Sequence, residues 1–382
     1  MYSVYDFGCF IANEIRTGAY VRALRNAVKP GSVVADIGTG TGIWALLACR
    51  FGARRVYAIE PNEAIHVAKE IAVVNGFAER IEFIQKLSMQ VTLPERVDVV
   101  ISDLRGILPL FQRHLPFIVD ARLRFLKPDG VLIPQRDTMW VAVVEAPDLY
   151  RSYTAPWEDN AYGLDMEAAR KIATNTWHRG RVKPEQLLTE PKCWATLDYT
   201  LLEKPDVSGE VSLVATREGA AHGVSVWFDS ELTEGVSISN APTAPELIYG
   251  NAFFPFSNSV PLAAGDKISV EIYANLVSED YVWRWNTFVL SQGQKEHVKA
   301  DLNQSTFYGI PLSQGTLQKI ANNHVPMLED EGLIDQFILS QMNGNTSLGE
   351  IAERLLDSFP DHFPKWYDAL TRVGQLSKKY SR

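Results

Sequence analysis

The sequence predicts three successive parts: an open parallel α/β sheet, an antiparallel β sandwich or barrel, and a small helical module. Short apolar segments that alternate with segments of helical spacing predict the first part. From about Cys193 to Leu290 apolar and polar residues alternate with period two, which predicts antiparallel strands. Helical spacing returns in the last seventy residues. We therefore expect domains at 1–134, 135–310 and 311–382.

A glycine-rich turn is the clearest motif of the α/β part. The apolar run Val33–Ile37 predicts a buried strand, and Gly38, Gly40 and Gly42 follow it in the spacing GxGxG. Glycines let a backbone turn tightly and approach a ligand closely. The next apolar run ends at Glu60, where a carboxylate can accept hydrogen bonds from ribose hydroxyls. The motif predicts a Rossmann-like domain that binds a nucleoside-containing cofactor.

Two cofactors contain such a nucleoside. A dinucleotide site has the spacing GxGxxG and a pyrophosphate at the helix N-terminus. This chain instead has GxGxG, and Asp36 stands two residues before Gly38. A carboxylate there would repel a pyrophosphate but suits the ammonium group of an amino-acid-bearing nucleoside. The spacing favours S-adenosyl-L-methionine over NAD, with a turn that binds nothing as the remaining alternative.

Composition limits the partners and the compartment. The net charge is 37 − 46 = −9 and no long basic run occurs, which disfavours nucleic acid. Three scattered cysteines indicate neither a disulfide framework nor a metal site. No apolar stretch reaches membrane-spanning length, and the N-terminus lacks a signal sequence. We expect a cytoplasmic protein with no nucleic-acid or membrane partner.

Residues at the ends of neighbouring strands should meet in one pocket. Gly38, Glu60 and Asp103 each follow a predicted parallel strand, and such strand ends bind ligands. The chain before the first strand has helical spacing from about Phe10, with Ile11, Ile15, Val21 and Leu24 as candidates for its buried face. Arg16 on that helix would either be a solvated charge or, if the helix covers the nucleotide site, bind a cofactor carboxylate. Residues 150–188 also have helical spacing.

These motifs resemble those of the protein arginine methyltransferases from about Tyr2 to Leu290. The matching segments are RTGAY, which contains Arg16, VVADIGTGTGI, IEP, ISDLRG, LKPDGVLIP, WEDNAYGLDM and HGVSVWFDSEL. The glycine motif is shared by many methyltransferases, whereas YGLDM and the β-domain pattern are specific to this family. The resemblance implies a class I S-adenosylmethionine-dependent methyltransferase with a Rossmann-like domain followed by a β-barrel domain.

The resemblance also implies roles for individual residues. Arg16 would bind the methionine carboxylate and Glu60 the ribose, and Ser88 would be a further cofactor contact. The remaining cofactor contacts would be Asp36, Gly38, Gly40 and Gly42. Family members dimerise through an arm that corresponds to about 153–188, so a homodimer is implied.

The acceptor residues of the family are only partly present. Its two substrate-binding glutamates fall on Asp103 and Gln112, and its Thr-His-Trp segment falls on Leu247, Ile248 and Tyr249. Asp103 is the best candidate for acceptor contact or base, with Gln112 as the second catalytic position. A guanidinium facing one carboxylate keeps much of its charge, so arginine specificity does not transfer.

Several functions remain open at this point. The first hypothesis is methylation of a protein or peptide side chain. The alternatives are N- or O-methylation of a small molecule and a non-catalytic scaffold that binds the cofactor. Arg105, Arg113 and His114 would either bind a carboxylate-bearing acceptor or form a solvated loop face. Residues 337–360 resemble a small winged-helix-like domain that binds leader peptides; the alternative is a helical module that packs on the barrel or on the partner subunit.

Overall fold

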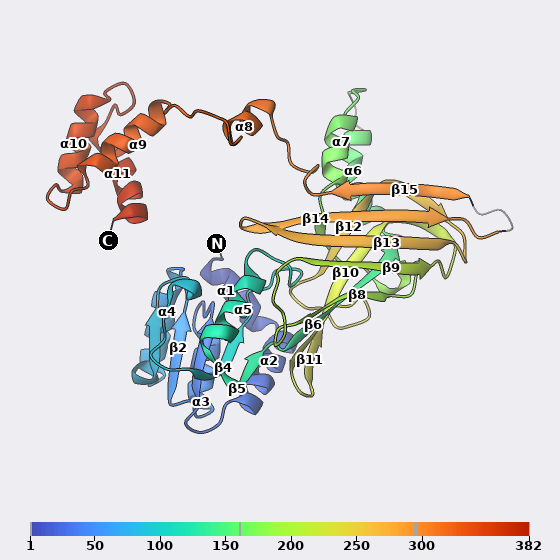
Figure 1. The fold of residues 1–382 in the computed structure, drawn as a ribbon, viewed down its shortest axis with the longest axis horizontal. Helices are drawn as coiled ribbons and strands as arrows, with labels where there is room; N and C mark the ends of the chain where they lie inside the picture. The colour runs from blue at the N-terminus through green and yellow to red at the C-terminus, as the bar shows by residue number, and fades with distance from the viewer. Residues whose placement is uncertain (1, 160–161, 294–296, 382) are drawn as a thin grey trace. The chain divides into compact units, whose positions relative to one another are not determined.

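A computed structural model describes residues 2–159, 162–293 and 297–381, and the chain separates into two compact units, Met1–Pro311 and Leu312–Arg382. The first unit contains the α/β part and the β part side by side (Figure 1). The second unit is helical. Among the described residues, no helix is long and apolar enough to cross a bilayer.

The α/β part is built on a five-stranded parallel sheet with the order β3-β2-β1-β4-β5. The strands are β1 (Val33–Ile37), β2 (Arg55–Ile59), β3 (Ile81–Ile84), β4 (Val97–Ser102) and β5 (Leu126–Ile133). The strand order reverses at β1, so a crevice forms at the carboxyl ends of β1 and β4. This confirms the predicted Rossmann-like sheet.

Helices surround this sheet (Figure 1). They are α1 (Val4–Ala12), α2 (Glu14–Ala27), α3 (Ile43–Arg50), α4 (Ala64–Val74) and α5 (His114–Arg124), with single 3₁₀ turns at Ala78–Arg80 and Ser88–Gln90. The N-terminal segment is two helices, because the Asn13 side chain accepts from the Arg16 N–H and starts α2 anew. Ile11 and Ile15 are exposed, so the buried face predicted for them is wrong, whereas Leu24 is buried as predicted.

The β part consists of two antiparallel sheets. The first has the order β7-β12-β10-β6-β8 with β11 on β10, and the second has the order β15-β14-β13-β9. The bounds are β6 (Arg136–Val144), β7 (His178–Gly180), β8 (Lys192–Asp198), β9 (Val207–Val214), β10 (Gly219–Thr233), β11 (Val236–Ser239), β12 (Asn251–Leu262), β13 (Lys267–Val277), β14 (Asp280–Leu290) and β15 (Val298–Ser305). Phe254 of β12 packs against Trp283 and Trp285 of β14 at ring-centre distances of 5.3 and 5.2 Å, which places the shared core between the sheets.

The predicted helical arm is helical only over its first part. It consists of α6 (Pro147–Glu158) and α7 (Glu167–Thr174). The prediction of helix up to residue 188 is wrong, because β7 pairs with β12 and a 3₁₀ turn follows at Pro184–Gln186. The rings of Trp177 and Phe254 stack with their centres 5.9 Å apart, and this packing holds the segment against β12. Residues 160 and 161, inside the WEDNAYGLDM segment, lie outside the described residues.

The second unit is a set of helices with its own core. It contains α8 (Gln314–Lys319), α9 (Asp330–Gln341), α10 (Leu348–Ser358) and α11 (Trp366–Tyr380). Residues from the last three helices form its apolar cluster, including Ile338, Leu355 and Val373. Ser347 and Glu350 form a capping box at the start of α10. Over the described residues 312–381 the unit has helices and turns but no strand, so no strand edge is present for peptide addition.

Candidate active site

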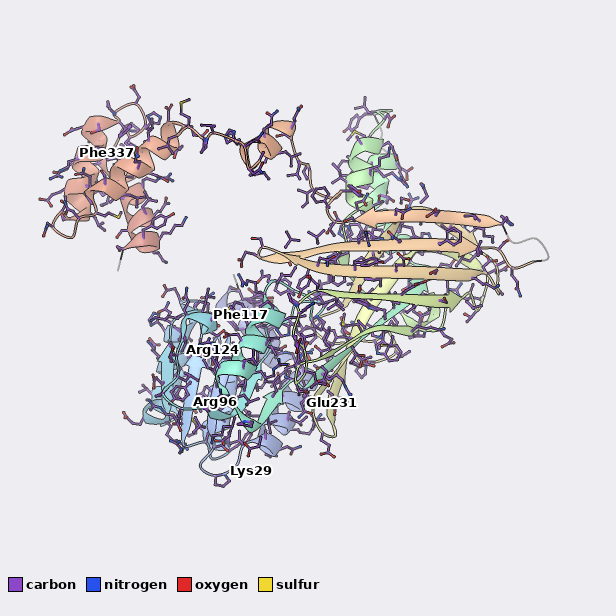
Figure 2. All side chains as sticks on the ribbon, in the orientation of Figure 1. Lys29, Arg96, Phe117, Arg124, Glu231 and Phe337 are labelled. Carbon is purple, nitrogen blue, oxygen red and sulfur yellow. The ribbon has the colours of Figure 1, made fainter. Side chains whose placement is uncertain are left out.

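A cavity of about 930 Å³ lies at the carboxyl ends of β1, β2 and β4. Gly38, Glu60 and Asp103 all line it, so the three residues expected to converge do lie together. We call the part built from the ends of β1 and β2 the glycine end. The loop end is the part built from the chain after β4 and from the β domain, including Tyr249. Phe117 on α5, labelled in Figure 2, also lines the cavity.

The glycine turn needs its glycines for both conformation and space. Gly38, Gly40 and Gly42 have φ values of 76°, 54° and 88°, which L side chains rarely adopt. A Cβ on Gly38 would lie 2.3 Å from a methyl carbon of Leu104, and one on Gly40 would lie 2.4 Å from the Phe7 ring. The turn is therefore packed closely between the loop after β4 and helix α1.

Glu60 ties the turn to the second strand. One carboxylate oxygen accepts from the Gly40 N–H at 3.0 Å and the other from the Asn62 N–H at 2.9 Å. Burial raises the pKa of this carboxyl, while the two backbone donors oppose that rise. Each oxygen keeps a second lone pair for a further donor.

Asp36 is fully buried beneath the turn. Its Oδ2 accepts from the Thr39 hydroxyl at 2.5 Å and from the Ala45 N–H at 3.0 Å, whereas Oδ1 has no partner among the described residues. Burial raises the pKa of Asp36 to about 7. An orphaned carboxylate oxygen without a cation fits a site that receives a cationic group. Glu60 thus offers acceptor atoms to a ribose from the cavity wall, whereas Asp36 lies behind the turn and can act on an ammonium group only through its charge.

Arg16 lies between the two ends of the cavity. Its Nε donates to Asp103 Oδ2 at 2.8 Å and to the Tyr249 hydroxyl at 2.9 Å, and its Nη2 also donates to Asp103. The guanidinium is buried over the rings of Tyr20 and Trp44, 5.4 and 5.5 Å from their centres. Its position against a carboxylate is compatible with the predicted role of binding another one.

Asp103 is neutralised from both sides. Oδ2 accepts from Arg16 and from the Tyr249 hydroxyl, the latter at 2.7 Å, and Oδ1 lies 3.1 Å from Arg105 Nε. Burial by itself would raise the pKa of Asp103, but the charges of Arg16 and Arg105 hold it below its ordinary value. The residue predicted to bind or deprotonate an acceptor is an ionised carboxylate that two arginines compensate.

A second buried aspartate continues this network. Arg105 Nη1 donates to Asp137 Oδ1 at 3.1 Å, and its Nη2 donates to the Tyr20 hydroxyl at 3.1 Å. The Tyr199 hydroxyl donates to the other Asp137 oxygen. Sequence reasoning missed Asp137, although an aspartate at the start of the apolar segment TMWVAVV is a signal of a buried, paired charge.

The other loop residues differ from one another in setting. Gln112 is exposed at the cavity wall with φ 44°, and its N–H donates to Asp280 Oδ1 at 3.2 Å. Arg113 pairs with the exposed Glu279 at 3.2 Å. His114 is buried with no partner for either ring nitrogen among the described residues. Burial and the charge of Arg105 lower the pKa of His114 to about 3, so it is neutral.

The other residues predicted to contact the cofactor lie behind or beside the cavity wall. Asp36, Gly40 and Gly42 do not line the cavity but belong to the turn that forms its glycine end. Ser88 is buried in a 3₁₀ turn outside the cavity wall, where its carbonyl accepts from Arg124 at 2.9 Å. In this structure Ser88 therefore belongs to its own 3₁₀ turn and does not reach the cavity.

Comparisons with known proteins agree with this architecture. The family model described as "Arginine methyltransferase oligomerization subdomain" matches residues 135–287, and that of "Ribosomal protein L11 methyltransferase (PrmA)" matches residues 16–134. Protein arginine N-methyltransferase 1 of Dictyostelium discoideum is 30% identical over 267 residues, which cover 68% of this chain and 78% of that protein. This chain belongs to the protein arginine methyltransferase family. It is thus a member of a family of S-adenosylmethionine-dependent methyltransferases, as the sequence predicted.

Other relatives are matched over different shares of their length. Human protein arginine N-methyltransferase 2 is 30% identical over 267 residues, 66% of this chain but only 61% of that protein. The fold is shared with the Trypanosoma brucei PRMT1 enzyme–prozyme complex with AdoHcy, with a TM-score of 0.72, 23% identity, and coverage of 79% of this chain and 98% of that one. Arabidopsis thaliana protein arginine methyltransferase 10 has a TM-score of 0.70, 22% identity, and coverage of 80% and 98%.

Proposed function

We propose that this family member transfers the methyl group of S-adenosylmethionine to a side chain of a protein or peptide, and that this side chain is not arginine. The observation that carries the proposal is the difference between the two ends of the cavity. At the glycine end, no ion pair to Asp36 occurs among the described residues, whereas at the loop end Arg16 and Arg105 both form ion pairs with Asp103, although its Oδ1, like that of Asp36, has no hydrogen-bond donor.

The glycine end supplies the cofactor contacts. Glu60 would accept from the ribose hydroxyls, the carboxylate of Asp36 would compensate the ammonium group, and Arg16 would donate to the methionine carboxylate with guanidinium hydrogens that Asp103 does not use. When bound, S-adenosylmethionine supplies an electrophilic methyl group on a sulfonium. The residues of the chain orient it and exclude water from the buried network around Arg16.

Asp103 acts in this proposal as a positioning residue. Because it accepts from both Arg16 and Tyr249, it fixes the guanidinium that faces the cofactor carboxylate. The pKa of Asp103 lies below its ordinary range, so it is a weak proton acceptor. The exposed amide of Gln112 adds no charge at this end.

A turnover assay tests this function. We expect titration calorimetry to detect S-adenosylmethionine binding and a peptide library to give release of S-adenosylhomocysteine. Cofactor binding without release in the presence of any peptide would contradict the proposal and favour a non-catalytic scaffold. Release with small metabolites alone would favour the small-molecule alternative. The cytoplasmic location expected from the sequence is tested by cell fractionation.

We also propose a homodimer through the arm formed by α6 and α7. Tyr162 and Leu164, which connect these helices, are 85% and 61% exposed. A Tyr162→Asp, Leu164→Asp double variant should dissociate the dimer, because two charges would have to be buried in the interface. Sedimentation velocity measures this, with the exposed Leu201→Asp as a control. A wild-type protein that sediments as a monomer would contradict the dimer.

A further inference from the structure

The segment that follows the arm adds a cation to the loop end. Trp177 lies just before β7 and Arg179 lies within it, and both line the cavity. In an extended segment such residues share a side, since side chains alternate with period two. Between them His178 faces elsewhere, with its ring stacked 3.6 Å from that of Tyr153. An aromatic surface and a guanidinium therefore face the cavity together.

Arg179 is held in place without a carboxylate. Its Nη2 donates to the backbone carbonyl of Ile248 in the segment that carries Tyr249. Its stem runs over Gly250, where an added Cβ would lie 3.1 Å from Arg179 Nε. Among the described residues no carboxylate forms an ion pair with it, whereas Arg113 pairs with Glu279. Of the arginines that line the cavity within the described residues, Arg179 is thus the one without a carboxylate partner.

The loop end also lacks a proton acceptor among the described residues. Asp103 is ionised but compensated by two arginines, and the buried ring of His114 has a pKa of about 3. The other carboxylates of the cavity have different places: Glu60 belongs to the glycine end and Asp6 accepts from Ser3 in the capping box of α1. Methylation of a guanidinium, an amine or a hydroxyl releases a proton, so each of these reactions benefits from a base.

A carboxylate is the acceptor that matches both features. We propose that the loop end binds a carboxylate through Arg179 and that the enzyme forms a methyl ester on it; this inference rests on the proposed methyl transfer to a peptide. A lone pair of the carboxylate oxygen forms the new bond to the sulfonium methyl carbon. The carbon–sulfur bond breaks and its electron pair stays on sulfur. The products are an uncharged ester and S-adenosylhomocysteine, and no proton moves.

The chemistry of the product tests this inference directly. The full-length protein is incubated with S-adenosylmethionine labelled in its methyl group and with one of three acceptors: a glutamate-rich peptide, free glutarate or a glycine–arginine repeat peptide. Methyl esters hydrolyse to volatile methanol in mild base, whereas N-methyl groups do not. We expect base-labile label on the glutamate-rich peptide. Base-stable label on the glutamate-rich peptide would overturn the carboxylate inference while leaving the proposed peptide methylation intact. Base-stable label on the glycine–arginine repeat peptide would overturn both the carboxylate inference and the exclusion of arginine from the proposed function.

Two other outcomes separate the inference from the proposed function. Base-labile label on glutarate alone would support the carboxylate inference and overturn the proposed peptide acceptor. Absence of label on all three acceptors, with cofactor binding retained, would overturn both.

Variants of two nearby arginines test the role of Arg179. Arg179→Ala should lower kcat/KM for the glutamate-rich peptide by roughly 10- to 100-fold, as loss of a charge-assisted hydrogen bond implies. Most of the loss should appear in KM and in peptide affinity measured by calorimetry without cofactor, and Arg179→Lys should restore part of it. Arg181→Ala is the matched control, because Arg181 lies two residues on, pairs with Glu246 and is not in the cavity wall. Equal effects of the two alanine variants would overturn the assignment.

Discussion

Asp36 in β1 and Asp103 directly after β4 both have buried side chains at the same edge of one sheet, yet they are in opposite electrostatic states. Asp36, at the glycine end, has backbone and hydroxyl donors but no cation, and burial raises its pKa to about 7. Asp103, at the loop end, has two arginines, and their charges hold its pKa below the ordinary value. Among the described residues Asp36 has no ion-pair partner, and in the proposed function the cofactor ammonium group would supply that cation, whereas Asp103 is already paired with two arginines.

Under the proposed function, this difference would allow one family fold to keep its cofactor while changing its acceptor. The glycine end depends on backbone geometry that the spacing GxGxG specifies, and it tolerates few changes. The electrostatic state of the loop end depends on individual side chains, so a single substitution can change it. Here Arg105 takes part in compensating Asp103, and Tyr249 donates to the same oxygen that Arg16 contacts.

The largest expected effect is on stability and comes from Arg105. Arg105→Leu should lower the free energy of unfolding by about 3–5 kcal/mol, because Asp137 would remain buried without its cation. Urea unfolding measures this. Arg113→Leu is the control, since its pair with the exposed Glu279 is worth at most about 1 kcal/mol. A loss equal to that of the control would mean that the buried network does not hold the loop end.

The next effect is on cofactor affinity at the glycine end. Glu60→Ala should weaken S-adenosylmethionine binding by about 1.5–3 kcal/mol, which is roughly 10- to 150-fold in Kd, through loss of hydrogen bonds to a charged group. Titration calorimetry measures the change, and Glu82→Ala on the exposed edge strand β3 serves as the control. An unchanged Kd for Glu60→Ala would place the cofactor elsewhere.

A smaller effect distinguishes the two ends by pH. The native pKa of His114 is about 3, below the unfolded value, so the unfolded state binds more protons and stability falls as pH decreases below about 6.5. The contribution of Asp36 to stability changes with pH in the opposite direction. Its native pKa is raised to about 7, so the folded state binds more protons and stability rises as the pH falls below about 7. Between pH 6.5 and 5.5, the buried neutral His114 should lower the free energy of unfolding by about 1 kcal/mol.

Single variants should separate these opposing contributions in urea unfolding without cofactor. His114→Asn should make the protein gain stability on acidification relative to the wild type, and Asp36→Asn should make it lose stability. Parallel pH profiles for the wild type and both variants would show that neither group is as buried as the structure describes.

The fold and the glycine end could be predicted because their signals are local. Glycines at positive φ, a carboxylate at the end of β2 and period-two segments act through the backbone of a few consecutive residues. The helix predicted up to residue 188 was wrong because β12 provides an edge for β7, and only the tertiary structure shows that edge.

The state of the loop end could not be predicted, because it depends on contacts between distant segments. Asp103 meets Arg16 from 87 positions earlier and Tyr249 from 146 positions later. The sequence showed that Gln112 is neutral, but it did not show that the remaining carboxylate is compensated. The position of Arg179 could not be predicted either, because the spacing of its segment predicts a helix where the structure has the strand β7.

The smallest expected effect comes from restoring the second family carboxylate. Gln112→Glu should not confer methylation of arginine peptides, because Asp103 would still be compensated by Arg16 and Arg105. The assay measures transfer of label to a glycine–arginine repeat peptide, and a reaction of the same variant without peptide is the control. Activity that appears with this single change would show that the missing charge alone limits the site.

The central claim is that the loop end does not accept a guanidinium, and one assay of the wild-type protein tests it most directly. The full-length protein is incubated with labelled S-adenosylmethionine and a glycine–arginine repeat peptide, after calorimetry has shown that the cofactor binds. A guanidinium would meet Arg179 and an already compensated Asp103, so we predict no transfer above the background without enzyme. Efficient, base-stable methylation of this peptide would contradict the account.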